Sequence, residues 1–122
     1  MKTENIIREK SFEFALKIID LYKYLHYKKK EYILSKQLLR SGTSVGANVE
    51  EAQAARSKKD FISKISIAAM EARETHYWLR LLKHGNYITK NNVLDDCEEL
   101  IRLLTSIVKS SAENNSKFKI QN

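Results

Sequence analysis

Apolar residues return along most of the chain at steps of three and four, which is the period of one face of an α-helix. Short connections between such segments place consecutive helices antiparallel. We therefore expect an all-α fold, an antiparallel up-down-up-down four-helix bundle that forms a single domain over residues 1–122. The predicted helices cover about residues 11–28, 32–55, 57–84 and 90–110, and a frayed tail is expected at 112–122.

The third segment has the strictest period. It begins after Ser57, which with Asp60 resembles a capping box, and it ends at Gly85. The first segment has a row through Ile19 and Tyr22 beside a second apolar row through Phe14 and Ile18, so its apolar face is wide enough to contact two neighbouring helices. The expected core draws on all four segments and contains Ile19, Tyr22, Leu38, Val45, Phe61, Ile65, Ala68, Ala72, Leu79, Leu100 and Leu104.

Small residues form a stripe on the second segment. Gly42 and Gly46 are four residues apart, with Ser41, Ser44 and Ala47 around them. Each glycine costs a helix about 1 kcal/mol relative to alanine, so its presence needs a reason in the packing. We expect another helix backbone to approach this stripe closely.

Composition agrees with a helical protein, since the 122 residues include three Gly and no Pro. No apolar run is long enough to cross a membrane, the first ten residues do not resemble a signal peptide, and Cys97 has no second cysteine to pair with. We therefore expect a cytoplasmic protein without a membrane partner.

The net charge is +7, and residues 1–60 hold 13 of the 22 Lys and Arg. This excess of positive charge permits binding to RNA or DNA without requiring it. Two groups of cations are candidates for nucleic-acid binding, one at the first turn and one around the second. They are Lys28, Lys29 and Lys30, and Arg40, Arg56, Lys58 and Lys59.

Enzyme motifs are weak in this sequence. A di-iron bundle needs Glu-x-x-His pairs, and none of His26, His76 and His84 has a carboxylate three residues before it. Glycine loops for nucleotides are missing too, so we expect no metal and no cofactor. One polar cluster is open to two interpretations. In the first, the glutamates pair with nearby arginines and the asparagine forms a hydrogen bond across the bundle. In the second, the cluster is a binding site. Its members are Asn48, Glu50, Glu51 and Glu74.

Wide apolar faces on the first and third segments carry more large residues than one small bundle needs to bury. We therefore expect self-association, with Tyr22, Tyr24, Tyr77 and Trp78 as candidate contacts between subunits.

Several blocks of the sequence resemble the 23S rRNA intervening-sequence protein family. They are Leu38 to Ala52, with its Ser-rich to Asn-x-Glu core, Ser57 to Phe61, Glu71 to Thr75 and Gly85 to Ile88. The resemblance spans about Ser11 to Lys109 and implies a small bacterial antiparallel bundle that assembles as a ring-like homopentamer. Some genes of this family lie inside insertions in large-subunit rRNA genes. A more distant resemblance is to the accessory protein of diversity-generating retroelements, a pentameric bundle that binds reverse transcriptase and nucleic acid.

Three functions follow in order of preference. The first is a non-enzymatic oligomeric adaptor that binds structured RNA or a nucleic-acid-associated protein through its basic surface. The second is a protein-binding or self-assembling scaffold with no nucleic-acid role. The third is an enzyme that uses the carboxylates Glu50, Glu51 and Glu74, which would need a raised carboxylate pKa or a bound metal.

Overall fold

The computed structural model describes the backbone of residues 2–89 and 92–121 and the side chains of residues 5–89 and 92–112. The described chain is built from four α-helices and one π-helical turn. They are α1 (Lys2–Lys23), η1 (Tyr24–Lys28), α2 (Leu34–Gln53), α3 (Lys58–His84) and α4 (Asn92–Gln121). This confirms the predicted all-α four-helix fold.

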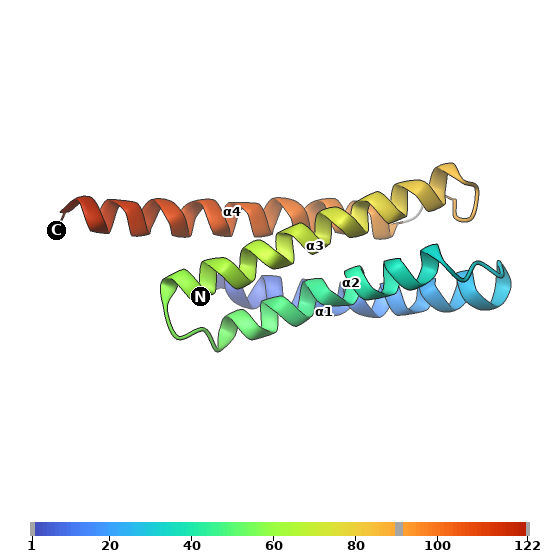
Figure 1. Cartoon of the computed structure of the whole chain (residues 1–122), viewed down its shortest axis with the longest axis horizontal. Coiled ribbons are helices and arrows are strands. Elements are labelled where there is room, and N and C mark those ends of the chain that lie inside the picture. Colours follow the sequence, from blue (N-terminus) through green and yellow to red (C-terminus); the bar gives the residue numbers. More distant parts are fainter. Residues whose placement is uncertain (1, 90–91, 122) are drawn as a thin grey trace.

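Consecutive helices run in opposite directions in Figure 1, where the α1–α2 and α3–α4 connections lie at one end and the α2–α3 connection at the other. Each helix packs against its neighbours in the chain, and α1 also packs against α4, which closes the bundle. Within the described residues, none of the helices combines the length and the apolar character needed to span a membrane.

Two helices are longer than the sequence pattern predicted. α1 begins at Lys2 and not near residue 11, because Ile7, Ser11, Phe14 and Ile18 continue one buried face through the small polar Ser11. α4 continues to Gln121, where the expectation was a helix end near 110 and a frayed tail from 112. That last segment contains neither Gly nor Pro, so nothing in it stops a helix.

The core confirms most of the residues expected from periodicity. Those that are buried as predicted are Leu38, Val45, Ile65, Ala68, Ala72, Leu79, Leu100 and Leu104. Phe61 is half-buried and packs against this core. In α1 the prediction chose the wrong row, because Phe14 and Ile18 are buried while Ile19 and Tyr22 are half-buried. The two rows are adjacent on the helix, and the positions of α2 and α4 decide which one faces inward.

The glycines of α2 mark a close approach to α1, as the small-residue stripe predicted. A Cβ atom on Gly42 would lie 2.8 Å from side-chain carbons of the buried Ile18. A Cβ atom on Gly46 would lie 3.3 Å from the backbone oxygen of Ser11. The two helices therefore have no room for a larger side chain at Gly42.

We expect Gly42→Val to lower the free energy of unfolding by about 1 to 3 kcal/mol, the usual cost of overpacking a core. Urea denaturation followed by circular dichroism measures this change. Ala47→Val is the control, because it places the same residue type in α2 at a position that is exposed. Equal stability of the two variants would contradict the close approach.

Candidate nucleic-acid interface

The α1–α2 connection is held by a buried carboxylate. Glu31 is 9% exposed, and its two carboxylate oxygens accept the backbone N–H groups of Ile33, Leu34 and Ser35 at 3.2, 3.0 and 2.7 Å. The Ser35 hydroxyl donates to the Glu31 carbonyl at 2.7 Å. A negative charge at a helix N-terminus satisfies free N–H groups and complements the helix dipole, so Glu31 fixes the start of α2.

The backbone before Glu31 has two unusual conformations. Residues Tyr24–Lys28 form the π-helical turn η1, and Lys30 has a φ of 56°, in the left-handed region that non-glycine residues seldom adopt. The N–H groups of Lys29 and Glu31 donate to the carbonyls of Tyr24 and Leu25 at 3.2 and 2.9 Å. Such conformations cost energy and gather at functional sites, so this connection is a place to look for function.

The cations of this connection point to solvent. Lys28, Lys29 and Lys30, here called the turn lysines, are all exposed. Across the part of the chain whose side chains are described, none of the three forms an ion pair with a carboxylate. The Lys29 ammonium lies 5.9 Å from the ring centre of Tyr24. The turn lysines therefore present three adjacent charges on an ordered segment.

Aromatic residues flank the turn lysines along the chain. His26 packs against Tyr22, Tyr27 and Tyr32 with ring centres 5.5, 4.6 and 4.9 Å apart. Tyr27 and Tyr32 are 65% and 47% exposed. Neither tyrosine was predicted as a site residue, although both lie within two residues of a turn lysine.

The second predicted group of cations is divided by the structure. Arg56, Lys58 and Lys59 are exposed beside the α2–α3 connection, where the Ser57 hydroxyl accepts the N–H of Asp60 at 3.0 Å, as the capping signal predicted. α2 has 20 residues, so this group and the turn lysines are separated by about 30 Å along the bundle. They form two basic surfaces, one at each end of α2.

Arg40 does not belong to either basic surface. Its guanidinium donates to Glu71 at 3.3 Å and to Glu74, both on α3. The hydrogen bond to Glu74 is the main cause that holds the pKa of Arg40 above its ordinary value, and the same bond holds the pKa of Glu74 below its ordinary value. Its charge is therefore compensated within the bundle.

The predicted polar cluster does not converge on one site. Glu50 pairs with Arg8 of α1 at 3.1 Å, Glu51 pairs with Lys64 of α3 at 3.1 Å, and Glu74 pairs with Arg40. One of the two interpretations had Glu50 and Glu51 pair with arginines. Glu50 does pair with an arginine, whereas Glu51 pairs with a lysine.

Asn48 bonds differently from the expectation. Its side-chain amide donates to the Ser44 carbonyl of the same helix at 2.9 Å and not across the bundle. An amide side chain in a helix reaches the carbonyl one turn earlier, and this local bond satisfies it. Among the described residues, no three His, Cys, Asp or Glu side chains are grouped closely enough to hold a metal ion.

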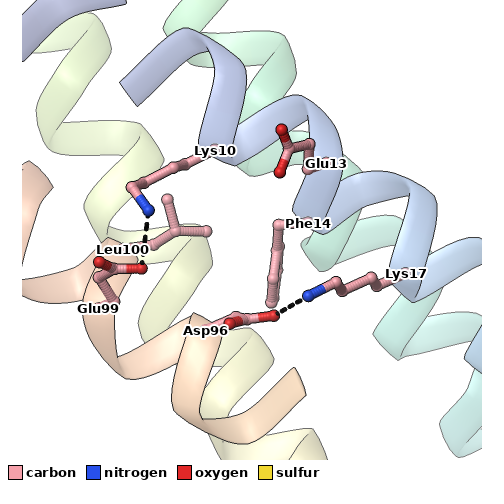
Figure 2. A pocket seen from close by; sticks show the side chains of 7 residues that line it. All are labelled: Lys10, Glu13, Phe14, Lys17, Asp96, Glu99 and Leu100. Atoms are coloured by element: carbon pink, nitrogen blue, oxygen red, sulfur yellow. Dashed lines mark hydrogen bonds and ion pairs between the residues drawn. The ribbon is translucent and has the colours of Figure 1, made fainter. Parts of the chain in front are cut away.

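A small hollow between α1 and α4 is closed by ion pairs, as Figure 2 shows. Lys10 contacts Glu99 at 3.3 Å and Lys17 contacts Asp96 at 2.6 Å, on either side of Phe14. The hydrogen bond to Asp96 raises the pKa of Lys17. The cavity holds about 50 Å³, enough for one or two water molecules, and its cations are already paired. The two ion pairs link α1 to α4 across this hollow.

The aromatic residues expected at subunit contacts differ in exposure. Tyr24 and Tyr77 are 43% and 47% exposed, whereas Tyr22 is half-buried. Trp78 is half-buried as well, and its indole N–H donates to Glu74 at 3.0 Å. Three further apolar side chains on the same helix as Tyr77 are exposed, and none of them was predicted as a subunit contact: Ile67, Met70 and Leu81.

Two comparisons place the chain among known proteins. One similar crystal structure is described as a protein of unknown function from the S23 ribosomal protein family of Bacteroides thetaiotaomicron VPI-5482. It is 49% identical, covers 88% of this chain and 98% of its own, and superposes with a TM-score of 0.85. No curated protein matches. A model of the 23S rRNA-intervening sequence protein family matches residues 3–106, so the chain belongs to this family.

Proposed function

We propose that the protein is a non-enzymatic, oligomeric adaptor that binds structured RNA through its basic surfaces. The observation that carries this proposal is the exposed set of turn lysines, held on an ordered connection and free of ion pairs to the described carboxylates. A phosphate backbone is the partner that three adjacent cations fit best. The family name supports a connection with rRNA.

Binding of this kind is electrostatic and largely independent of sequence. Lysine ammonium groups neutralise phosphates, and the released counterions make affinity fall steeply with salt. One protomer offers few contacts, so its own affinity is weak. An oligomer repeats the turn lysines around one face, and several weak contacts then add through avidity.

Self-association is supported by apolar surface on two separate faces. The α3 stripe, defined as Ile67, Met70, Tyr77 and Leu81, is exposed along one side of α3. On another face, Phe12 and Leu16 of α1 are 63% and 49% exposed, and Phe12 borders a hollow of about 160 Å³ between α1 and α2. Two different apolar faces on one protomer suit a heterologous contact, the kind of contact that builds a ring when its rotation closes. The resemblance to the family suggests five subunits.

We expect Met70→Glu to dissociate the oligomer, because it places a charge in the middle of the α3 stripe. Light scattering at micromolar concentration should give a multiple of the 14.2 kDa chain for the parent protein and 14.2 kDa for the variant. Ile33→Glu is the control, since Ile33 is 76% exposed and lies outside both apolar faces. A monomeric parent protein would contradict the proposal of assembly.

The second candidate is a protein-binding or self-assembling scaffold with no nucleic-acid role. The exposed α3 stripe favours it, because such a surface can contact another protein without any help from the lysines. A nucleic-acid-associated protein is one partner of this kind.

Titration of the parent protein into a labelled RNA hairpin separates the two candidates. The adaptor predicts weak binding at low salt that falls steeply as salt is added, with similar affinity for hairpins of unrelated sequence. An affinity that does not change with salt, or no binding even at low ionic strength, would exclude the adaptor and leave the scaffold.

A further inference from the structure

We propose that Tyr27 and Tyr32 stack on unpaired bases, so that the α1–α2 connection prefers single-stranded segments of RNA to duplex. This inference rests on the proposed binding of RNA by the turn lysines and specifies which part of an RNA they bind. The two residues are called the turn tyrosines below.

Exposed aromatic rings are concentrated at this connection. Five Phe, Tyr or Trp side chains of the described residues are exposed, and Tyr24, Tyr27 and Tyr32 are three of them. Tyr27 comes directly before the turn lysines, and Tyr32 follows them after Glu31. An apolar ring gains nothing from exposure to water, whereas every base offers a flat face on which it can stack. Cations for the backbone and rings for the bases are the combination found in single-strand binding sites.

Both turn tyrosines are held by the same side chain. The His26 ring meets Tyr27 at an interplanar angle of 74° and Tyr32 at 71°, the edge-on arrangement that aromatic pairs favour. His26 is half-buried, and its ring also packs against Tyr22 of α1 with ring centres 5.5 Å apart, which links it to the bundle. His26 is thus a positioning residue, and the rings it holds lose little further freedom when a base stacks on them.

The turn lysines alone would not give a preference for single strands. Duplex carries the higher charge density, and its binding depends more strongly on released counterions than that of single strands. Bases inside a duplex are stacked on each other and cannot reach a protein ring. A preference for single strands would therefore be due to stacking on the turn tyrosines and not to the charge of the turn lysines.

Fluorescence anisotropy with two probes tests the inference. One probe is a short labelled RNA without self-complementarity, and the other is the same strand annealed to its complement. We expect the parent protein to bind the single strand more tightly. Tyr27→Leu with Tyr32→Leu should weaken single-strand binding by about 5- to 150-fold for each base that stacks, and change duplex binding less than about twofold.

A conservative variant controls for folding and for the hydroxyl groups. Tyr27→Phe with Tyr32→Phe keeps both rings, so it should bind the single strand like the parent protein. Equal or tighter binding of duplex by the parent protein, or equal single-strand binding by the leucine and parent proteins, would overturn the stacking inference and leave the proposed RNA binding intact. Failure of the parent protein to bind either probe at low salt would instead overturn both.

Discussion

Replacing all three turn lysines by glutamine is expected to weaken binding of an RNA hairpin by about 100-fold at physiological salt. Each lysine that neutralises a phosphate contributes about a fivefold gain in affinity at this ionic strength, because it releases close to one condensed cation. The side chains are exposed and form no ion pair with the carboxylates whose positions are described, so their loss should leave the fold unchanged. Fluorescence anisotropy measures the affinity, and circular dichroism checks the helices.

A variant with the same net charge separates a local surface from a general effect of charge. Lys10, Lys17 and Lys64 pair with Glu99, Asp96 and Glu51 at 3.3, 2.6 and 3.1 Å. Replacing these three lysines by glutamine removes the same three charges, but from cations that are already compensated. We expect this control to keep affinity within a few-fold of the parent protein. Equal weakening by both variants would show that net charge, and not the turn lysines, determines binding.

Leu79→Ala is expected to lower the free energy of unfolding by about 2 to 5 kcal/mol, the range for truncation of a core leucine. Leu79 has no exposed surface and lies on the face of α3 that carries the buried Ile65, Ala68 and Ala72. The lost stability is the sum of the transfer free energy of the removed methyl groups and the free-energy cost of the cavity that they leave. Urea denaturation of parent and variant gives the difference directly.

Ile33→Ala is the matched control for this truncation. Ile33 is 76% exposed, so removal of a similar number of carbon atoms there should change stability by less than about 0.5 kcal/mol. If Leu79→Ala unfolded at the same urea concentration as the parent protein, the assignment of Leu79 to the core would be wrong.

The third helix shows how much the sequence alone can predict. Its predicted bounds, 57–84, differ by one residue from the observed Lys58–His84, and Ser57 caps it as expected. Regular apolar steps, a capping serine and a following glycine are all local signals. The close approach at Gly42 was also predictable, because two glycines in a helix need a reason in the packing.

The contacts between distant residues could not be read from the sequence. Glu50 pairs with Arg8 across 42 residues, and nothing local to Glu50 selects that partner over another cation. Ile19 and Tyr22 were placed in the core because their row is apolar, but the neighbouring row of Phe14 faces α2 and α4. Tertiary packing decides between two such rows, and periodicity does not.

The α1–α2 connection, which carries the turn lysines, was predicted in part. The run of lysines is visible in the sequence. The conformation of the connection that carries them depends on Glu31, whose carboxylate reaches the N–H groups of Ile33 to Ser35 only after the chain has turned. His26 likewise meets Tyr22 one helical turn before it and Tyr32 beyond the turn. A periodic pattern describes helices, and it carries no information about the geometry of a connection between them.

The salt dependence of RNA binding tests the central proposal most directly. We would measure the affinity for one RNA hairpin over a series of salt concentrations, for the parent protein and for the variant with Lys28, Lys29 and Lys30 replaced by glutamine. The plot of log affinity against log salt should be shallower for the variant by about 3, close to one unit for each lysine that contacts a phosphate. Parallel lines for the two proteins would mean that the turn lysines do not contact RNA.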